Sequence, residues 1–191
     1  MRYSPEHKEE TRRRIVAAAA RAFRRSGFEG VSVAGVMEEA GLTVGGFYRH
    51  FDSKEELFDA AVVEAMADTL RLMRRRGASE VRGEAWMAKA AAHYLTPEHR
   101  RAVDLGCPLP SLTGEVGRRD PDLRRRFEGT LADIARAAAE RIDPDAPEAA
   151  RGRAWSFLST LVGSLLLARG VDDEDLAREI LEAGRRAAAR A

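Results

Sequence analysis

The sequence has one cysteine, few aromatic residues and no long apolar run, and each shortage excludes a class of protein. With a single cysteine among 191 residues, the chain can form neither an internal disulfide nor a metal site made of cysteines alone. No apolar run reaches the roughly 18 residues that a membrane span needs. The first ten residues are polar and charged, unlike a secretory signal. We therefore predict a cytoplasmic protein with no membrane partner.

Runs of alternating β-branched residues are absent as well, and apolar residues recur at helical spacing along nearly the whole chain. Glycine and proline fall mostly between these periodic stretches, where helices end. The pattern predicts an all-α fold of about nine helices. Their expected bounds are 5–25, 33–40, 44–49, 54–76, 84–94, 97–103, a broken or paired helix over 111–117 and 121–142, 148–169 and 174–190. We expect a stiff irregular segment at 106–110.

Neither sign of charge dominates, since the chain has 32 lysines and arginines against 31 aspartates and glutamates. This balance excludes a polybasic tail protein. It does not exclude nucleic-acid binding, because the sum hides where the charges lie. Residues 1–50 carry nine basic and six acidic side chains, so a small positive excess lies at the N-terminal end. Arg12, Arg13 and Arg14 contribute to it, and we interpret them as a solvated helix face.

Two short expected helices are separated by Gly41-Leu42-Thr43, with Ser32 and Thr43 at their N-cap positions. This is the spacing of a helix-turn-helix, in which the second helix enters the major groove of DNA. That helix begins Val44-Gly45-Gly46, although each glycine costs about 1 kcal/mol of helix stability relative to alanine. We interpret the glycine pair as a sign that another backbone approaches closely.

Polar side chains continue from the second helix into the next one. They are Tyr48, Arg49, His50 and Lys54. Their spacing allows them to reach one phosphate strand, and Ser32 can donate to a phosphate at the start of the supporting helix. A glycine turn between two short helices also occurs in proteins that never bind DNA. Both interpretations stay open on spacing alone.

Residues 33–57 resemble the DNA-binding segment of the TetR family of bacterial transcriptional regulators, and the resemblance extends back to Ile15. Its most specific part is the run Phe-Tyr-Arg-His-Phe-Asp-Ser-Lys-Glu-Glu-Leu at 47–57. The resemblance implies a homodimer of all-helical subunits. It also implies a function, usually that of a repressor which a small-molecule effector, bound in the C-terminal domain, releases from double-stranded DNA. Two recognition helices about one DNA turn apart would read a pseudo-palindromic operator.

The resemblance further implies which residues contact DNA. The base-facing start of the recognition helix is matched by Thr43, Val44, Gly45 and Gly46. The phosphate contacts are matched by Tyr48, His50 and Lys54, with Ser32 as cap and phosphate donor and Arg49 as a further base or phosphate contact. Few of these side chains offer donors to base edges, so we expect DNA shape to carry much of the specificity. We divide the chain into a DNA-binding domain at 1–53 and a helical effector-binding and dimerisation domain at 54–191.

Residues 155–168 are apolar on more than one face, as in a helix that is buried on two sides. We expect the core on one side and a partner subunit on the other, and a monomeric core that buries both sides is the alternative. The last helix offers an apolar stripe of Leu176, Ile180, Ala183 and Ala187. The expected dimer-interface residues are Leu158, Leu161, Val162, Leu165, Leu166, Ile180 and Leu181.

The effector is expected in a cavity between helices with aromatic walls. Its expected lining is Trp86, His93, Tyr94, Cys107, Phe127 and Trp155, each of which is also compatible with ordinary core. Cys107 allows three interpretations: a small buried hydrophobe, a pocket residue, or a thiol that senses oxidants or electrophiles when arginines stabilise its thiolate. The last interpretation gives an alternative function, a regulator switched by Cys107.

No set of catalytic residues is visible in the sequence. Paired carboxylates and a nucleophile motif around Cys107 are missing, and His7, His93 and His99 lack metal-ligand spacing with the cysteine. We therefore expect no enzymatic activity, no cofactor and no metal. A helical enzyme or scaffold that has lost DNA binding is the remaining alternative.

Overall fold

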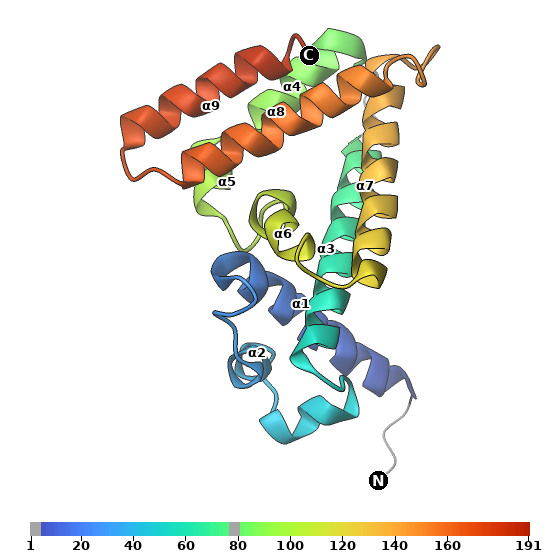
Figure 1. Ribbon diagram of the computed structural model, residues 1–191, viewed down its shortest axis with the longest axis vertical. Coiled ribbons are helices and arrows are strands. Elements are labelled where there is room, and N and C mark those ends of the chain that lie inside the picture. The colour runs from blue at the N-terminus through green and yellow to red at the C-terminus, as the bar shows by residue number, and fades with distance from the viewer. Residues whose placement is uncertain (1–4, 77–80) are drawn as a thin grey trace.

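The computed structural model describes residues 5–76 and 81–191, and every regular element in these two ranges is a helix (Figure 1). The all-α prediction is therefore confirmed. The elements are α1 (Pro5–Ser26), α2 (Val33–Glu39), the 3-10 helix η1 (Val44–Arg49), α3 (Lys54–Arg76), α4 (Gly83–Tyr94), α5 (Pro97–Arg101), α6 (Leu109–Val116), α7 (Pro121–Ile142), α8 (Arg151–Arg169) and α9 (Glu174–Ala188). None of these helices is long and apolar enough to cross a bilayer.

The helices form two groups that α3 and α6 connect. In Figure 1, α1, α2 and η1 lie together at one end, and α8 and α9 run side by side at the other. The long helix α3 packs against both α1 and α7, and α6 contacts both α1 and α8. A domain boundary at residue 53, where α3 begins, stays a prediction, because these two helices belong to both groups.

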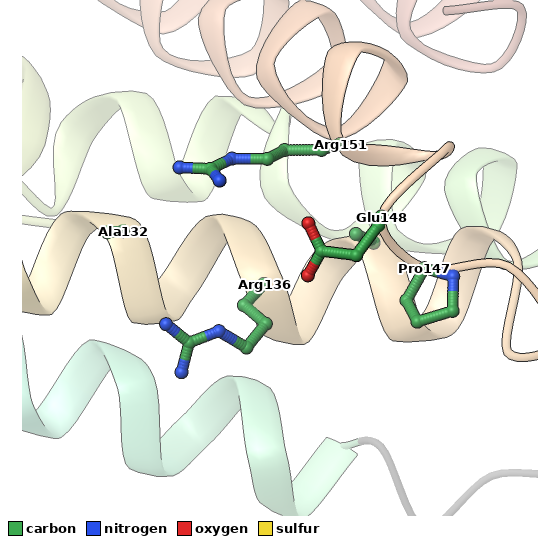
Figure 2. Close-up of a pocket in the computed structure, with 6 residues that line it drawn as sticks. Ala132, Arg136, Pro147, Glu148 and Arg151 are labelled. Carbon is green, nitrogen blue, oxygen red and sulfur yellow. The ribbon is translucent and has the colours of Figure 1, made fainter.

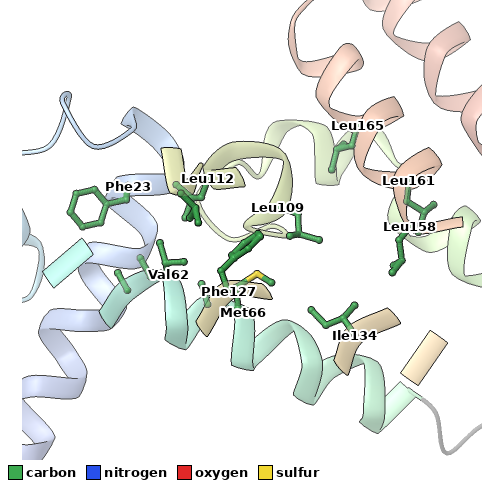
Figure 3. Close-up of a cluster of buried hydrophobic side chains, with 14 of the residues drawn as sticks. Phe23, Val62, Met66, Leu109, Leu112, Phe127, Ile134, Leu158, Leu161 and Leu165 are labelled. Carbon is green, nitrogen blue, oxygen red and sulfur yellow. The ribbon is translucent and has the colours of Figure 1, made fainter. Parts of the chain in front are cut away.

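One continuous hydrophobic cluster runs through both groups. At the N-terminal end the Phe58 ring meets those of Phe23 and Phe28 edge to face, with centroids 5.0 and 5.4 Å apart. Figure 3 follows the cluster from Phe23 past Phe127 to Leu165 of α8. The core of the C-terminal helices is therefore continuous with that of α1.

Local capping sets the helix boundaries near the N-terminus, as the sequence predicts. Ser32 Oγ accepts the backbone N–H of Gly35 at 3.1 Å and so caps α2. Gly41 ends the same helix with a left-handed φ of 67°. Ser53 Oγ accepts the N–H of Glu56 at 3.1 Å at the start of α3. These caps agree with the expected bounds.

Several details differ from the expected helices. Helix α5 ends at Arg101 and α9 ends at Ala188, each two residues earlier than expected. Residues 44–49 form a 3-10 helix, because two adjacent glycines disfavour an α-helical turn, and Thr43 makes no side-chain capping bond. Leu109 and Pro110 belong to α6 and not to an irregular segment, since the first turn of a helix tolerates a proline without an N–H. Helix α8 begins at Arg151, later than position 148.

Gly184 allows α9 to pack tightly on its neighbours. A Cβ atom at this buried position would lie 2.3 Å from Ser164 Oγ and 2.9 Å from Leu95 Cδ1. By contrast, a Cβ atom at Gly129 of α7 would have no described atom within 4 Å. A methyl group therefore fits at the exposed Gly129 and clashes at the buried Gly184.

We predict that Gly184→Ala lowers the free energy of unfolding by about 1–3 kcal/mol, because overpacking outweighs the gain in helix propensity. The matched Gly129→Ala change should raise it by about 0.5–1 kcal/mol. Urea unfolding at one fixed protein concentration measures both. Equal stabilisation by the two substitutions would contradict the close contact at Gly184.

Candidate nucleic-acid interface

The turn between α2 and η1 is fixed by backbone capping and by an arginine from α1. Leu42, which follows the left-handed Gly41, donates its N–H to the carbonyl of Met37 at 2.8 Å. Arg14 donates from Nη2 to the carbonyl of Ala40 at 2.7 Å. Arg14 was expected on a solvated face, so its bond to the end of α2 corrects that interpretation.

Helix η1 has one buried side and one exposed side. The Phe47 ring is fully buried, and its centroid lies 5.8 Å from that of Phe51. On the other side Val44 is 47% exposed and Gly45 is exposed as well. We call residues 43–46 the recognition segment. It lies at the end of the molecule opposite α8 and α9 (Figure 1).

The two glycines of the recognition segment are not required by backbone conformation or by packing within the chain. Neither has a positive φ. A Cβ atom at Gly45 would meet no described atom within 4 Å, and one at Gly46 would make an ordinary contact with Met37 at 3.7 Å. The close approach of another backbone that the sequence predicts is therefore not made at Gly45 by the described residues.

The other residues expected to contact DNA surround the recognition segment. Ser32, Thr43 and Arg49 are exposed. Tyr48 is 72% exposed, and its ring packs edge-on against Phe47 at 5.1 Å. Lys54 is half-buried, with Nζ 4.2 Å from the centroid of the Phe28 ring. These side chains therefore lie where a nucleic acid could reach them, and their roles stay predictions.

His50 differs from the other expected contacts because it is partly enclosed. Its Nδ1 atom is buried and has no hydrogen-bond partner among the described residues. Burial lowers the pKa of His50, and the cations Lys8, Arg12 and Arg49 lower it further, while Glu9 opposes them. The imidazole is therefore neutral near pH 7 in the free protein.

A contact that the sequence did not indicate joins this interface to the C-terminal helices. Two cations lie near the Phe28 ring, Lys54 with Nζ at 4.2 Å and Arg119 with its guanidinium carbon at 3.7 Å from the centroid. Glu115 of α6 accepts the backbone N–H of Phe28 at 3.2 Å. Residues almost ninety positions apart meet here, so no local pattern could have indicated the pairing.

None of the residues expected to line an effector pocket lines the two small cavities described below, and their role stays a prediction. The Trp86 and Phe157 rings pack 5.3 Å apart, Phe127 is buried in the core, and His93 is exposed. Two small cavities of about 80 and 60 Å³ are lined by other residues. Figure 2 shows the larger one, between α7 and the start of α8 beside Arg136 and Arg151.

The surroundings of Cys107 favour a structural role. Burial raises the pKa of its thiol, and hydrogen bonds with Tyr94 and the backbone of Leu109, together with the cations Arg169 and Arg24, counter only part of that shift. Its backbone N–H donates to His99 Nε2 at 3.1 Å and so fixes the loop before α6. A raised thiol pKa disfavours the thiolate that oxidants and electrophiles attack. Within the described ranges no group of three or more His, Cys, Asp or Glu residues could hold a metal ion.

The expected dimer-interface residues separate into two sets. Leu158, Leu161, Leu165 and Leu181 are buried within the single chain, because α8 packs against α4, α5, α6, α7 and α9. These four therefore cannot form the contact surface. Apolar residues that do reach the surface of the two helices define the α8–α9 patch: Val162, Leu166, Leu167, Leu176, Ile180, Ala183 and Ala187.

The fold and this geometry define a helix-turn-helix protein, with a supporting helix, a glycine turn and an exposed second helix. Residues 15–61 match the family model described as bacterial regulatory proteins, tetR family. An uncharacterised HTH-type transcriptional regulator of Lactococcus lactis subsp. lactis, in the lacX 3' region, is 23% identical over 171 residues, or 85% of each chain.

Solved structures share the whole fold. A TetR transcriptional regulator from Chloroflexus aurantiacus J-10-FL is 24% identical, with a TM-score of 0.75 over 95% of each chain. The FadR regulator of Bacillus subtilis, solved in complex with stearoyl-CoA, is 16% identical, with a TM-score of 0.63 over 90% of this chain and 96% of its own. The family match at residues 15–61 and the shared fold together support a DNA-binding transcriptional regulator of the TetR family.

We predict that Gly45→Ala leaves the free energy of unfolding unchanged or raises it by up to about 1 kcal/mol, because the new methyl group meets only solvent. The same change should lower affinity for a selected DNA duplex at least tenfold, because the methyl group stands where DNA approaches. Urea unfolding and fluorescence anisotropy measure the two effects, with Gly129→Ala as the control. Unchanged DNA affinity would contradict the placement of this glycine against DNA.

Proposed function

We propose that the protein is a homodimeric repressor that binds a pseudo-palindromic operator and is released by a small molecule bound among its C-terminal helices. The observation that carries the DNA-binding part is the exposed recognition segment beside a fully buried Phe47. The buried Phe47 holds the segment in a single orientation, and binding in a DNA groove requires such a fixed orientation. Tyr48, Arg49 and Lys54 flank it as the proposed backbone contacts.

The α8–α9 patch supports the dimer. Leu166 is 51% exposed and Leu167 is 64% exposed, and the apolar stripe of α9 reaches the surface beside them. Exposed apolar patches of this kind mark interaction surfaces. The small residues Ser159 and Gly163 on α8 would let a second helix approach closely. A two-fold pair of such surfaces would place two recognition segments on one duplex.

The contacts of Phe28 support control of DNA binding from the C-terminal helices. Glu115 holds its backbone, and Arg119 covers the ring that also contacts the proposed phosphate ligand Lys54. Arg24 of α1 donates to the carbonyl of Asp104 at 2.7 Å, just before α6. A ligand that displaces α6 would therefore shift the DNA-binding end, with a coupling of roughly 1–3 kcal/mol.

The related FadR structure supports a ligand in the C-terminal helices, because that protein was solved with stearoyl-CoA. Pockets for small molecules usually hold roughly 300–1,000 Å³, more than the cavities found here. We infer that an effector opens the core between the helices and that this opening moves α6. Neither the reactivity of Cys107 nor a catalytic site is needed for this mechanism.

We predict that Leu167→Glu converts the dimer to a monomer without unfolding it, because a charge cannot be buried unpaired at a subunit interface. Sedimentation velocity measures the mass, and anisotropy with a duplex selected by the wild-type protein measures affinity, which should fall at least tenfold. Leu72→Glu on α3, which is also exposed, is the matched control and should change neither quantity. A monomeric wild-type protein, or a Leu167→Glu dimer, would contradict the proposed interface.

A further inference from the structure

The inner face of α1 continues past the hydrophobic core as a basic face. Ile15 is fully buried, while Arg12 is half-buried and Lys8, one turn earlier, is exposed. Arg12 does not point freely into solvent, because its guanidinium carbon lies 4.7 Å from the centroid of the Phe51 ring. Phe51 directly follows His50, so this face of α1 overhangs the end of η1.

The three consecutive arginines of α1 therefore have three different surroundings. Arg14 caps α2, and Arg13 pairs with Glu10 of its own helix at 2.8 Å. Arg12 has no ion pair among the described residues and instead covers Phe51 beside His50. Of the three, Arg12 is the arginine that lies against Phe51, next to His50 in the chain, and Lys8 precedes it by one helical turn.

One ring nitrogen of His50 is buried, and the cations of the basic face influence the charge of the ring. Nδ1 is buried without a partner among the described residues, so a proton on it would be an unsatisfied buried donor. The stable neutral form carries its proton on Nε2, the ring nitrogen that remains accessible. Burial and the cations Lys8, Arg12 and Arg49 all lower the pKa of His50, against the carboxylate of Glu9. The surroundings of His50 thus favour a neutral imidazole that can donate an N–H bond close to positively charged side chains.

We propose that Lys8, Arg12 and His50 form one binding site for a backbone phosphate of duplex DNA, in which the two α1 cations supply the charge and His50 supplies a neutral N–H donor. The site adds α1 to the DNA interface, beyond the supporting helix and η1. It rests on the proposed function, because it needs DNA on the face that carries the recognition segment.

A salt titration distinguishes the contribution of the two cations to DNA affinity from that of the neutral His50 donor. Each cation that neutralises a phosphate contributes about one to the slope of log affinity against log salt concentration, whereas a neutral donor contributes none. Affinity of the full-length protein is measured between about 50 and 200 mM salt with a duplex selected from a random pool by the wild-type protein. Because the two cations share one phosphate, the double variant Lys8→Gln/Arg12→Gln should lower the slope by about one per bound subunit, and each single variant should lower it by less.

Arg13→Gln is the matched control, since it removes the same charge from the same helix away from the site, and it should leave the slope unchanged. Arg12→Lys keeps the charge and should keep the slope, which guards against a packing effect at Phe51. Urea unfolding of each variant verifies the fold. A slope that falls equally for Arg13→Gln and Lys8→Gln would overturn the site, because only total charge would then matter.

The His50 variants test the neutral donor. His50→Ala should lower affinity about tenfold with no change in slope. His50→Gln, whose amide nitrogen lies where Nε2 was, should recover most of that loss, and His50→Asn should not. A wild-type affinity that rises between pH 8 and pH 6 but not in His50→Gln would show a charged histidine and overturn the proposal. If the wild-type protein selects no duplex at all, the proposed function fails instead.

Discussion

The buried ring of Phe47 is the contact on which the DNA-binding end depends. A six-residue 3-10 helix with two glycines has little stability of its own, because short helices gain few hydrogen bonds for the residues they order. Packing of Phe47 near Phe51 gives this weak element one orientation. The opposite side of the helix can then carry two glycines. Glycines would leave space unfilled in a core, but on a surface they allow DNA to approach the backbone closely.

The same end of the molecule is tied to the C-terminal helices through Phe28. Lys54 and Arg119 both contact its ring, and Glu115 accepts its backbone N–H. Since α6 packs against both α1 and α8, a displacement near the proposed dimer surface and one near the proposed DNA surface involve the same helix. The cavities are small and the core is continuous, so a displacement of α6 requires the surrounding side chains to repack.

Features set by neighbours in sequence were predictable, and features set by neighbours in space were not. The cap at Ser32 and the stop at Gly41 follow from local hydrogen bonding and backbone sterics, so their positions agree with the structure. The bond from Arg14 to Ala40 and the contacts of Phe28 join distant segments, and no periodicity reveals them.

Helix α8 shows the same limit. Its apolar faces were visible in the sequence, but which face points to the core depends on the helices around it, and four leucines expected at an interface are buried in the chain. The residues expected to contact DNA follow one another along a short segment and its flanks, so the sequence alone allowed that prediction, and it stays a prediction. The basic face of α1 was missed, since only the fold brings Lys8 and Arg12 to the end of η1.

The central claim is that the recognition segment enters the major groove of DNA twice in each assembly. Methylation-interference and hydroxyl-radical footprinting on a selected duplex test it most directly. The account predicts two major-groove contact patches related by two-fold symmetry, about 10–10.5 base pairs apart or a multiple of that spacing. Contact with a single patch, or with the minor groove alone, would contradict it.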